Sequence, residues 1–272
     1  MEIWQAVILG LVQGLTEFLP VSSSGHIAFY NAIFNTETDV MFFTVILHLG
    51  TLVAVCAVFW KDIIALFKRP FKTLGFLVLA TVPAAVVGVV IEFCHLDDFL
   101  LARSCVGIVL CVLFLVTAVL LFVTEIVAKR RESVLPLCLK TVIPMGVAQA
   151  VAVLPGISRS GSTICAGTLA GCNREDVAKF SFLMSIPVIL GGFFVELALG
   201  LYKGEIQQNF TDYGATLGWS VALGFIISAV AGLFAIKVML KVIQKANYKW
   251  FSLYLVLMSI TSLVLQFTVF NA

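Results

Sequence analysis

The chain has few charged residues: Asp, Glu, Lys and Arg together make up 12% of its 272 residues. A soluble domain carries about 25% charged residues, so this scarcity excludes an ordinary globular protein with a solvated surface. The net charge of +2 and the lack of a basic patch also argue against nucleic-acid binding. Hydrophobic residues, by contrast, make up 61% of the chain. The composition predicts an integral membrane protein with no room for a soluble domain.

Cysteine pairs at metal-binding or redox spacing are also missing. The seven cysteines include no CxxC arrangement and stand mostly in apolar stretches, which is typical of small buried residues. The N-terminus lacks a basic first segment and a small-residue cleavage site, so we do not expect a cleaved signal peptide. Neither disulfides nor cysteine-bound metals are therefore expected to organise the fold.

Long apolar runs divide the chain into membrane spans. Runs such as 40–60 and 106–123 exceed the ~18 residues that indicate a transmembrane helix. We predict an all-α polytopic membrane protein that forms a single integral-membrane domain over residues 1–272. Its six predicted transmembrane helices are 40–60, 75–94, 104–124, 178–202, 215–236 and 249–270.

Basic residues support this division because they gather in alternate loops. Fourteen of the 17 lie in four stretches, 61–73, 125–140, 171–179 and 237–249. The other loops hold only Arg103, near Asp97 and Asp98, and Lys203, near Glu205 and Asp212. Cytoplasmic loops carry an excess of Lys and Arg. We therefore place the basic loops in the cytoplasm and both chain termini outside.

Two regions, 1–35 and 134–171, do not fit as single spans. Each has two apolar stretches interrupted by Pro, Gly and Ser. Basic residues flank the second region on both sides, so both of its ends are expected inside. The first region must likewise begin and end outside if 40–60 runs inward. We predict two re-entrant helical hairpins, whose irregular backbone persists at membrane depth only where protein buries it or a wet cavity is present.

The two interruptions repeat one pattern at an interval of half the chain length. Gly10, Gln13, Ser22, Ser24 and Gly25 are matched by Gly146, Gln149, Ser158, Ser160 and Gly161. A second match pairs 43–48 with 180–185, at an interval only one position longer. Each repeat, approximately 1–133 and 134–272, contains one hairpin and three spans. Because three is odd, the repeats should have inverted topology, with the hairpin tips meeting near the bilayer centre.

The first tip carries groups suited to acid–base or nucleophilic chemistry. Glu17 costs about 2.5–3.5 kcal/mol at the centre of a membrane helix, so it should have a partner or a task. It could act as a general base or hold a divalent cation, or it could only cap the turn. His26 lies three residues after Ser23, which would place an imidazole beside a hydroxyl, although a lone His often only satisfies a hydrogen bond.

The second tip carries groups suited to binding an anion. Arg159 is the only basic residue between Lys140 and Arg174, and its planar guanidinium suits phosphate. Gly161 lets backbone amides approach a ligand at a helix N-terminus, and a structural bridge to Glu17 is a compatible alternative. Hydroxyl groups are added by Ser158, Ser160 and Thr163. Together the tips predict a site for the phosphate head group of a lipid.

At these residues the chain resembles the bacitracin-resistance family of undecaprenyl-diphosphate phosphatases. The first family motif ends in Pro-Val-Ser-Ser-Ser/Thr-Gly-His, and the second reads Pro-Gly-x-Ser-Arg-Ser-Gly. The corresponding residues of this chain are 13–26 and 155–161. The resemblance covers essentially the whole chain. It implies removal of the terminal phosphate from the C55 isoprenyl diphosphate, which recycles the lipid carrier for cell-wall synthesis.

The resemblance also implies roles for single residues. Glu17 would be the catalytic or metal-binding acid, Ser23 the nucleophile or a phosphate ligand, His26 a proton donor or base, and Arg159 the clamp on the diphosphate. The substrate-binding residues would be Gln13, Ser22, Ser24, Ser158, Ser160, Gly161 and Thr163. Family members depend on a divalent cation, Mg²⁺ or Ca²⁺. Some carry Glu where this chain has Gln13, so Glu17 would hold the metal alone or with Glu196.

We thus expect a phosphatase of the bacterial cytoplasmic membrane whose cavity opens outward. Its partners would be a polyprenyl diphosphate and the lipid bilayer, with a homodimer left open. Attack would come from Ser23 or from water activated by Glu17. The alternative is a flippase or transporter that uses the same midplane anion site, because inverted repeats with broken helices are a transporter architecture. A purely structural scaffold leaves the burial of Glu17 and Arg159 unexplained.

Overall fold

The computed structural model describes residues 3–34, 40–94, 96–129, 135–203, 205–245 and 247–270, and over these ranges the predicted all-α architecture is confirmed. Arg130, Arg131 and the hairpin ends 1, 2, 35 and 134 lie outside the described residues. The same holds for the side chains of Asp97, Asp98, Lys203, Glu205, Asp212 and Lys245.

Five long apolar helices have the length and composition to cross a bilayer. They are α5 (Lys72–Phe93), α7 (Val106–Lys129), α10 (Arg174–Lys203), α11 (Glu205–Lys245) and α12 (Lys249–Leu265), which continues as a π-helical turn, Gln266–Phe270. Large apolar side chains on their outer faces are exposed, as on α7, because lipid rather than water surrounds them. The protein is therefore a multi-pass membrane protein.

A sixth span depends on a bent pair of helices. Helix α3 (Val40–Val58) is followed at once by α4 (Trp60–Leu66), and the pair bends by 82° at Phe59. By length and composition, the described residues thus contain five candidate membrane spans, or six if the bent pair counts as one. Helix α11 runs far beyond the predicted span 215–236, because hydropathy locates the apolar part of a helix and polar residues can extend it at either end.

The two interrupted regions each form a pair of short helices. Region 1–35 contains α1 (Ile3–Thr16) and α2 (Ser23–Phe34), and region 134–171 contains α8 (Leu139–Val151) and α9 (Arg159–Leu169). At ~1.5 Å per residue, none is long enough to cross a hydrocarbon core of ~30 Å. The two ends of each region meet. The rings of Trp4 and Phe34 lie 5.3 Å apart, and Leu135 N donates to Gly171 O at 2.7 Å.

Each first hairpin helix packs against a helix of the other half. Helix α1 lies along α11, and α8 lies along α5. Equivalent glycines make the closest approach: a Cβ on Gly10 would lie 2.7 Å from Gly224 O, and one on Gly146 would lie 2.9 Å from Ala80 Cα. The two halves therefore contact each other through residues that the sequence repeat relates.

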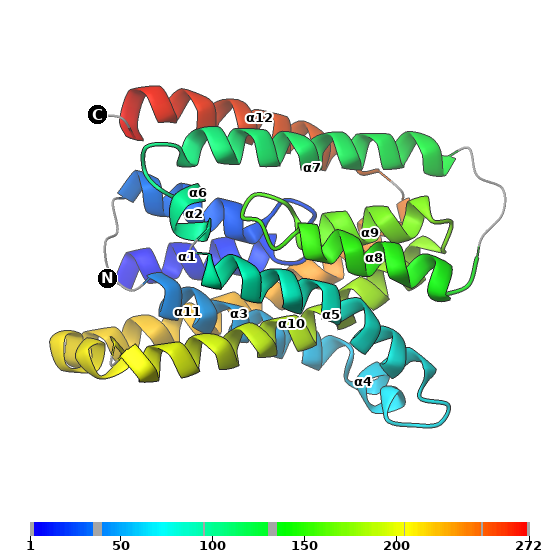
Figure 1. The fold of residues 1–272 in the computed structure, drawn as a ribbon, viewed down its shortest axis with the longest axis horizontal. Helices are drawn as coiled ribbons and strands as arrows, with labels where there is room; N and C mark the ends of the chain where they lie inside the picture. The colour runs from blue at the N-terminus through cyan, green and yellow to red at the C-terminus, as the bar shows by residue number, and fades with distance from the viewer. Residues whose placement is uncertain are drawn as a thin grey trace.

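Helices α7 and α12 also make a reciprocal pair of contacts. A side chain near the end of each helix accepts a hydrogen bond from a backbone N–H near the start of the other. Gln266 Oε1 accepts from Gly107 N at 2.6 Å, and Glu125 Oε2 accepts from Tyr248 N at 3.3 Å. The interval from Gly107 to Tyr248 along the chain equals that from Glu125 to Gln266. Such polar groups hold helices together where lipid removes the hydrophobic driving force. Figure 1 shows the two chain termini at one end of the bundle and α4 at the other.

We predict that Gly10→Ala destabilises the protein, because the new methyl group meets backbone that cannot rotate away. The expected cost is about 1–3 kcal/mol in the free energy of unfolding, measured as a lower midpoint of thermal unfolding in detergent. Gly75→Ala is the control, since a Cβ there meets nothing within 4 Å. Equal midpoints for the two variants would contradict the close packing of α1 on α11.

Candidate functional site

The turns of the two hairpins meet inside the bundle. Ser160 Oγ donates to Leu19 O at 2.9 Å. A Cβ on Gly161 would lie 3.2 Å from Pro20 Cβ, and one on Gly25 would lie 2.9 Å from Gly156 Cα. Pro20 and Gly156, like Gly25 and Gly161, are equivalent positions of the sequence repeat, so the second contact repeats the first with the halves exchanged.

A serine caps the second helix of each hairpin. Ser22 Oγ accepts from Gly25 N at 3.3 Å, and Ser158 Oγ accepts from Gly161 N at 3.1 Å. Ser22 has a φ of 67°, an unusual backbone for a residue other than glycine and one found at functional sites. The equivalent caps place Ser23 and Arg159 at the first residues of α2 and α9.

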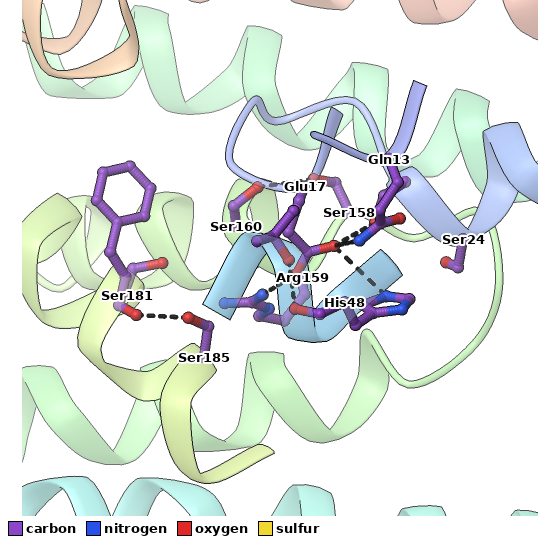
Figure 2. Close-up of polar contacts among 12 residues, drawn as sticks. Gln13, Glu17, Ser24, His48, Ser158, Arg159, Ser160, Ser181 and Ser185 are labelled. Carbon is purple, nitrogen blue, oxygen red and sulfur yellow. Dashed lines mark hydrogen bonds and ion pairs between the residues drawn. The ribbon is translucent and has the colours of Figure 1, made fainter. Parts of the chain in front are cut away.

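Glu17 is the centre of the polar groups that the tips bring together. Its Oε1 forms an ion pair with Arg159, which joins the first tip to the second. Its Oε2 accepts from Ser23 Oγ at 2.6 Å and from Gln13 Nε2 at 2.9 Å. The Glu17 side chain is 5% exposed. These partners therefore compensate for the hydration that the carboxylate loses on burial. Figure 2 shows Gln13 and Arg159 reaching Glu17 from different elements.

A cavity of about 540 Å³ lies beside this cluster. Most of its wall is apolar, and the polar side chains include Glu17 and Arg159. Among the predicted site residues, the wall also includes Ser22, Ser23, Ser24 and Ser158. A mostly apolar cavity with a few convergent polar groups is typical of a small-molecule or lipid site.

Four predicted substrate-binding residues lie behind this wall. Ser160 is bonded to Leu19 O, and Gly161 faces Pro20. Thr163 is fully buried, with its hydroxyl 2.6 Å from that of Ser181, and Gln13 holds Glu17. In the described part of the chain these four position the tips and do not line the cavity. Their predicted contact with substrate stays a prediction.

His26 is held away from the carboxylate. Its Nδ1 lies 2.8 Å from Ser22 O, and a carbonyl only accepts, so Nδ1 carries the proton. Its Nε2 therefore accepts from the Tyr254 hydroxyl at 2.6 Å. The described residues that line the cavity do not include His26. This geometry makes His26 a support for the Ser22 backbone, and its predicted acid–base role stays a prediction.

His48 lines the cavity and was not selected by the sequence analysis. Its Nδ1 lies 2.7 Å from Thr44 O and so donates, which leaves Nε2 facing Glu17 Oε2 at 3.6 Å. Figure 2 shows the imidazole turned toward Glu17. The sequence repeat could have indicated His48. It is the last residue of segment 43–48, which matches 180–185, and it aligns with the polar Ser185.

The cluster contains oxygen donors that suit a divalent cation. Gln13 Oε1 is buried beside Glu17 without a hydrogen-bond partner, so an oxygen donor is available. No group of three or more His, Cys, Asp or Glu side chains is arranged around a metal position in the described residues. Mg²⁺ commonly takes one or two carboxylates and completes its shell with water and substrate phosphates. Glu17 and Gln13 fit such a shared site, and Glu196 lines the same cavity.

Comparison with known proteins gives a consistent result along the chain. The profile of the family described as "Bacitracin resistance protein BacA" matches residues 6–261. An undecaprenyl-diphosphatase of Carboxydothermus hydrogenoformans is 40% identical over 98% of this chain and 98% of its own length. Similar proteins of the same name occur in Halothermothrix orenii, 37% identical over 97% of this chain and 98% of its own length, and in Bacteroides fragilis, 36% identical over 98% and 99%.

We predict that the Glu17–Arg159 pair is strongly coupled. Arg159→Gln leaves a buried carboxylate without its counter-charge, which should cost about 3–5 kcal/mol in stability. The double variant Glu17→Gln/Arg159→Gln should recover most of that loss, as measured by thermal unfolding in detergent. Lys179→Gln is the control, because it breaks the half-exposed pair with Asp62 and should cost less than ~1 kcal/mol. A double variant no more stable than Arg159→Gln would contradict the coupling.

Proposed function

This chain belongs to the family of the bacitracin resistance protein BacA, and on that premise we propose that it is an undecaprenyl-diphosphatase. It hydrolyses undecaprenyl diphosphate to undecaprenyl phosphate and inorganic phosphate. The product returns to cell-wall synthesis as the lipid carrier, in the cytoplasmic membrane of a bacterium. The observation that carries the proposal is the Ser23–Glu17–Arg159 cluster in the wall of a mostly apolar cavity.

The architecture we propose is a pair of inverted repeats, each with one re-entrant hairpin and three spans. The reciprocal contacts of the tips and of α7 with α12 support it, because a twofold axis exchanges the members of each pair. The joined ends of both hairpin regions support a chain that enters and leaves from one face. The termini lie at the end opposite α4, which supports their position outside the cell.

Arg159 would bind the diphosphate. Its Nη1 is buried and has no hydrogen-bond partner, while Nη2 is paired with Glu17. A guanidinium with free N–H donors suits the oxygens of a phosphate. Its position at the start of α9 adds the positive end of the helix dipole to the same place. The hydroxyls of Ser24 and Ser158 in the cavity wall would donate to the remaining oxygens.

Ser23 would be the nucleophile and Glu17 its general base. As the Ser23 Oγ–phosphorus bond forms, the hydroxyl proton passes to Glu17 Oε2, already 2.6 Å away. The bond from phosphorus to the bridging oxygen breaks, and its electron pair leaves with undecaprenyl phosphate, which takes the proton from Glu17. Water then attacks the phosphorus of the phosphoserine and gives a proton to Glu17. The bond from phosphorus to Ser23 Oγ breaks, Oγ takes that proton from Glu17, and inorganic phosphate is released.

A divalent cation would be held by Glu17 and the amide oxygen of Gln13, with the substrate phosphates completing its shell. When bound, it neutralises phosphate charge as a Lewis acid. Arg159 already balances one oxygen of Glu17, so the cation would bind well only together with the doubly charged head group.

We predict that Ser23→Ala and Glu17→Gln each lower phosphate release from undecaprenyl diphosphate by about 10²–10⁴-fold, because each removes one side of the proton transfer. Purified protein is assayed with added Mg²⁺ or Ca²⁺ and again with a chelator, which should abolish release. Thr261→Ala is the control, since this hydroxyl is exposed on α12. Lipid movement across the membrane without phosphate release by the wild type would favour a flippase instead.

We predict that a phosphatase reporter fused to the C-terminus is active, because the C-terminus lies outside the cell. The same reporter fused after Lys129 should be inactive, since that loop is predicted to be cytoplasmic. The two activities are compared in whole cells at equal expression. An inactive C-terminal fusion beside an active fusion at Lys129 would reverse the proposed orientation.

A further inference from the structure

The cavity extends beyond its polar groups along one face of α10. Val188 and Gly192 are one helical turn apart, as are Ile189 and Phe193, and all four line the cavity. Ala84 on α5 lines it as well. These five residues carry neither charge nor hydrogen-bonding side chains, so they suit hydrocarbon and not a second phosphate. Among the described lining residues of α10, the charged one is Glu196, one turn beyond Gly192.

Gly192 stands where this apolar part opens to the outside of the protein. It lines the cavity and yet is exposed, and a Cβ added to it would meet nothing within 4 Å. On α5, Gly88 lies one turn beyond Ala84 and also faces open space. Helices α5 and α10 are in contact, and Figure 1 shows them side by side. Each of these two contacting helices thus has a glycine beside open space, and on α10 that glycine also lines the cavity.

The surface around these two glycines is a lipid-facing surface. Val86 and Val89 on α5 are 58% and 48% exposed, and Phe194 on α10 is 62% exposed. Glycine inside a helix costs about 1 kcal/mol relative to alanine. At Gly10 and Gly146 close helix packing requires it. At Gly88 and Gly192 no neighbouring atom requires a glycine. The absence of a side chain there leaves open space beside each helix.

We propose that the polyprenyl tail leaves the cavity sideways, between α5 and α10, over Gly88 and Gly192. This inference rests on the proposed function. With the diphosphate at Glu17 and Arg159, the first isoprene units lie along the apolar face of α10 and the remaining units stay in the bilayer. A C55 tail then does not pass between Glu17 and Arg159, and a side chain that closes the gap discriminates against long tails.

The test compares Gly192→Leu with its neighbour Gly191→Leu. Gly191 also faces open space on α10 but does not line the cavity, so the pair matches in composition and helix propensity. We expect Gly192→Leu to lower kcat/KM for undecaprenyl diphosphate about tenfold, mainly through a higher KM. For a C5 isoprenyl diphosphate, short enough to remain inside the cavity, both variants should stay within about twofold of the wild type.

A second measurement locates the tail directly. An undecaprenyl diphosphate analogue with a photoreactive diazirine on its fourth isoprene unit is irradiated with the wild-type protein. Labelled peptides from α5 and α10 support the proposal, and labelling confined to α7 or α12 overturns it. Equal kinetics of the two Leu variants on the C55 substrate also overturn it. A wild type that releases no phosphate from that substrate refutes the proposed function instead, while the labelling result still decides the tail route.

Discussion

The ion pair between Glu17 and Arg159 is the interaction on which the site depends. Each charge alone would be very costly within the bundle, and each stands on a different broken helix pair. Their pairing fixes the two turns against each other and leaves the remaining donors and acceptors directed at the cavity. The carboxylate reaches Ser23, and the guanidinium keeps one buried nitrogen without a partner. One contact therefore joins the two tips, and under the proposed function it also prepares them for a charged ligand.

The two hairpins share equivalent caps and contacts, but their polar side chains differ. Equivalent serine caps begin α2 and α9, yet the residue after the cap is Ser23 in one half and Arg159 in the other. The position of Glu17 is occupied by Val153 in the second copy. Gln13 holds the carboxylate, whereas Gln149 donates to Ala80 O at 3.3 Å. In the proposed mechanism, these equivalent positions hold a nucleophile and its base opposite an anion-binding group.

Much of this site could be predicted because membrane burial makes polar residues informative. Glu17, Ser23 and Arg159 stood out as costly groups in apolar surroundings, and the structure brings these three together. The two histidines show the limit of that reasoning. Spacing along the chain placed His26 next to Ser23, but helix direction turns its ring toward Tyr254. His48 comes from a separate span, and only packing places it at Glu17.

The sequence by itself determined the helical class, the membrane location, the two broken regions and the identity of the charged pair. These follow from local hydropathy, glycine and proline positions and the cost of burying charge, all of which act over a few turns of chain. Tertiary structure alone decided which hydroxyls and imidazoles face the cavity, the extent of α11, and the gap beside Gly192. Those features depend on how distant helices are rotated about their own axes and packed, which spacing along one chain does not specify.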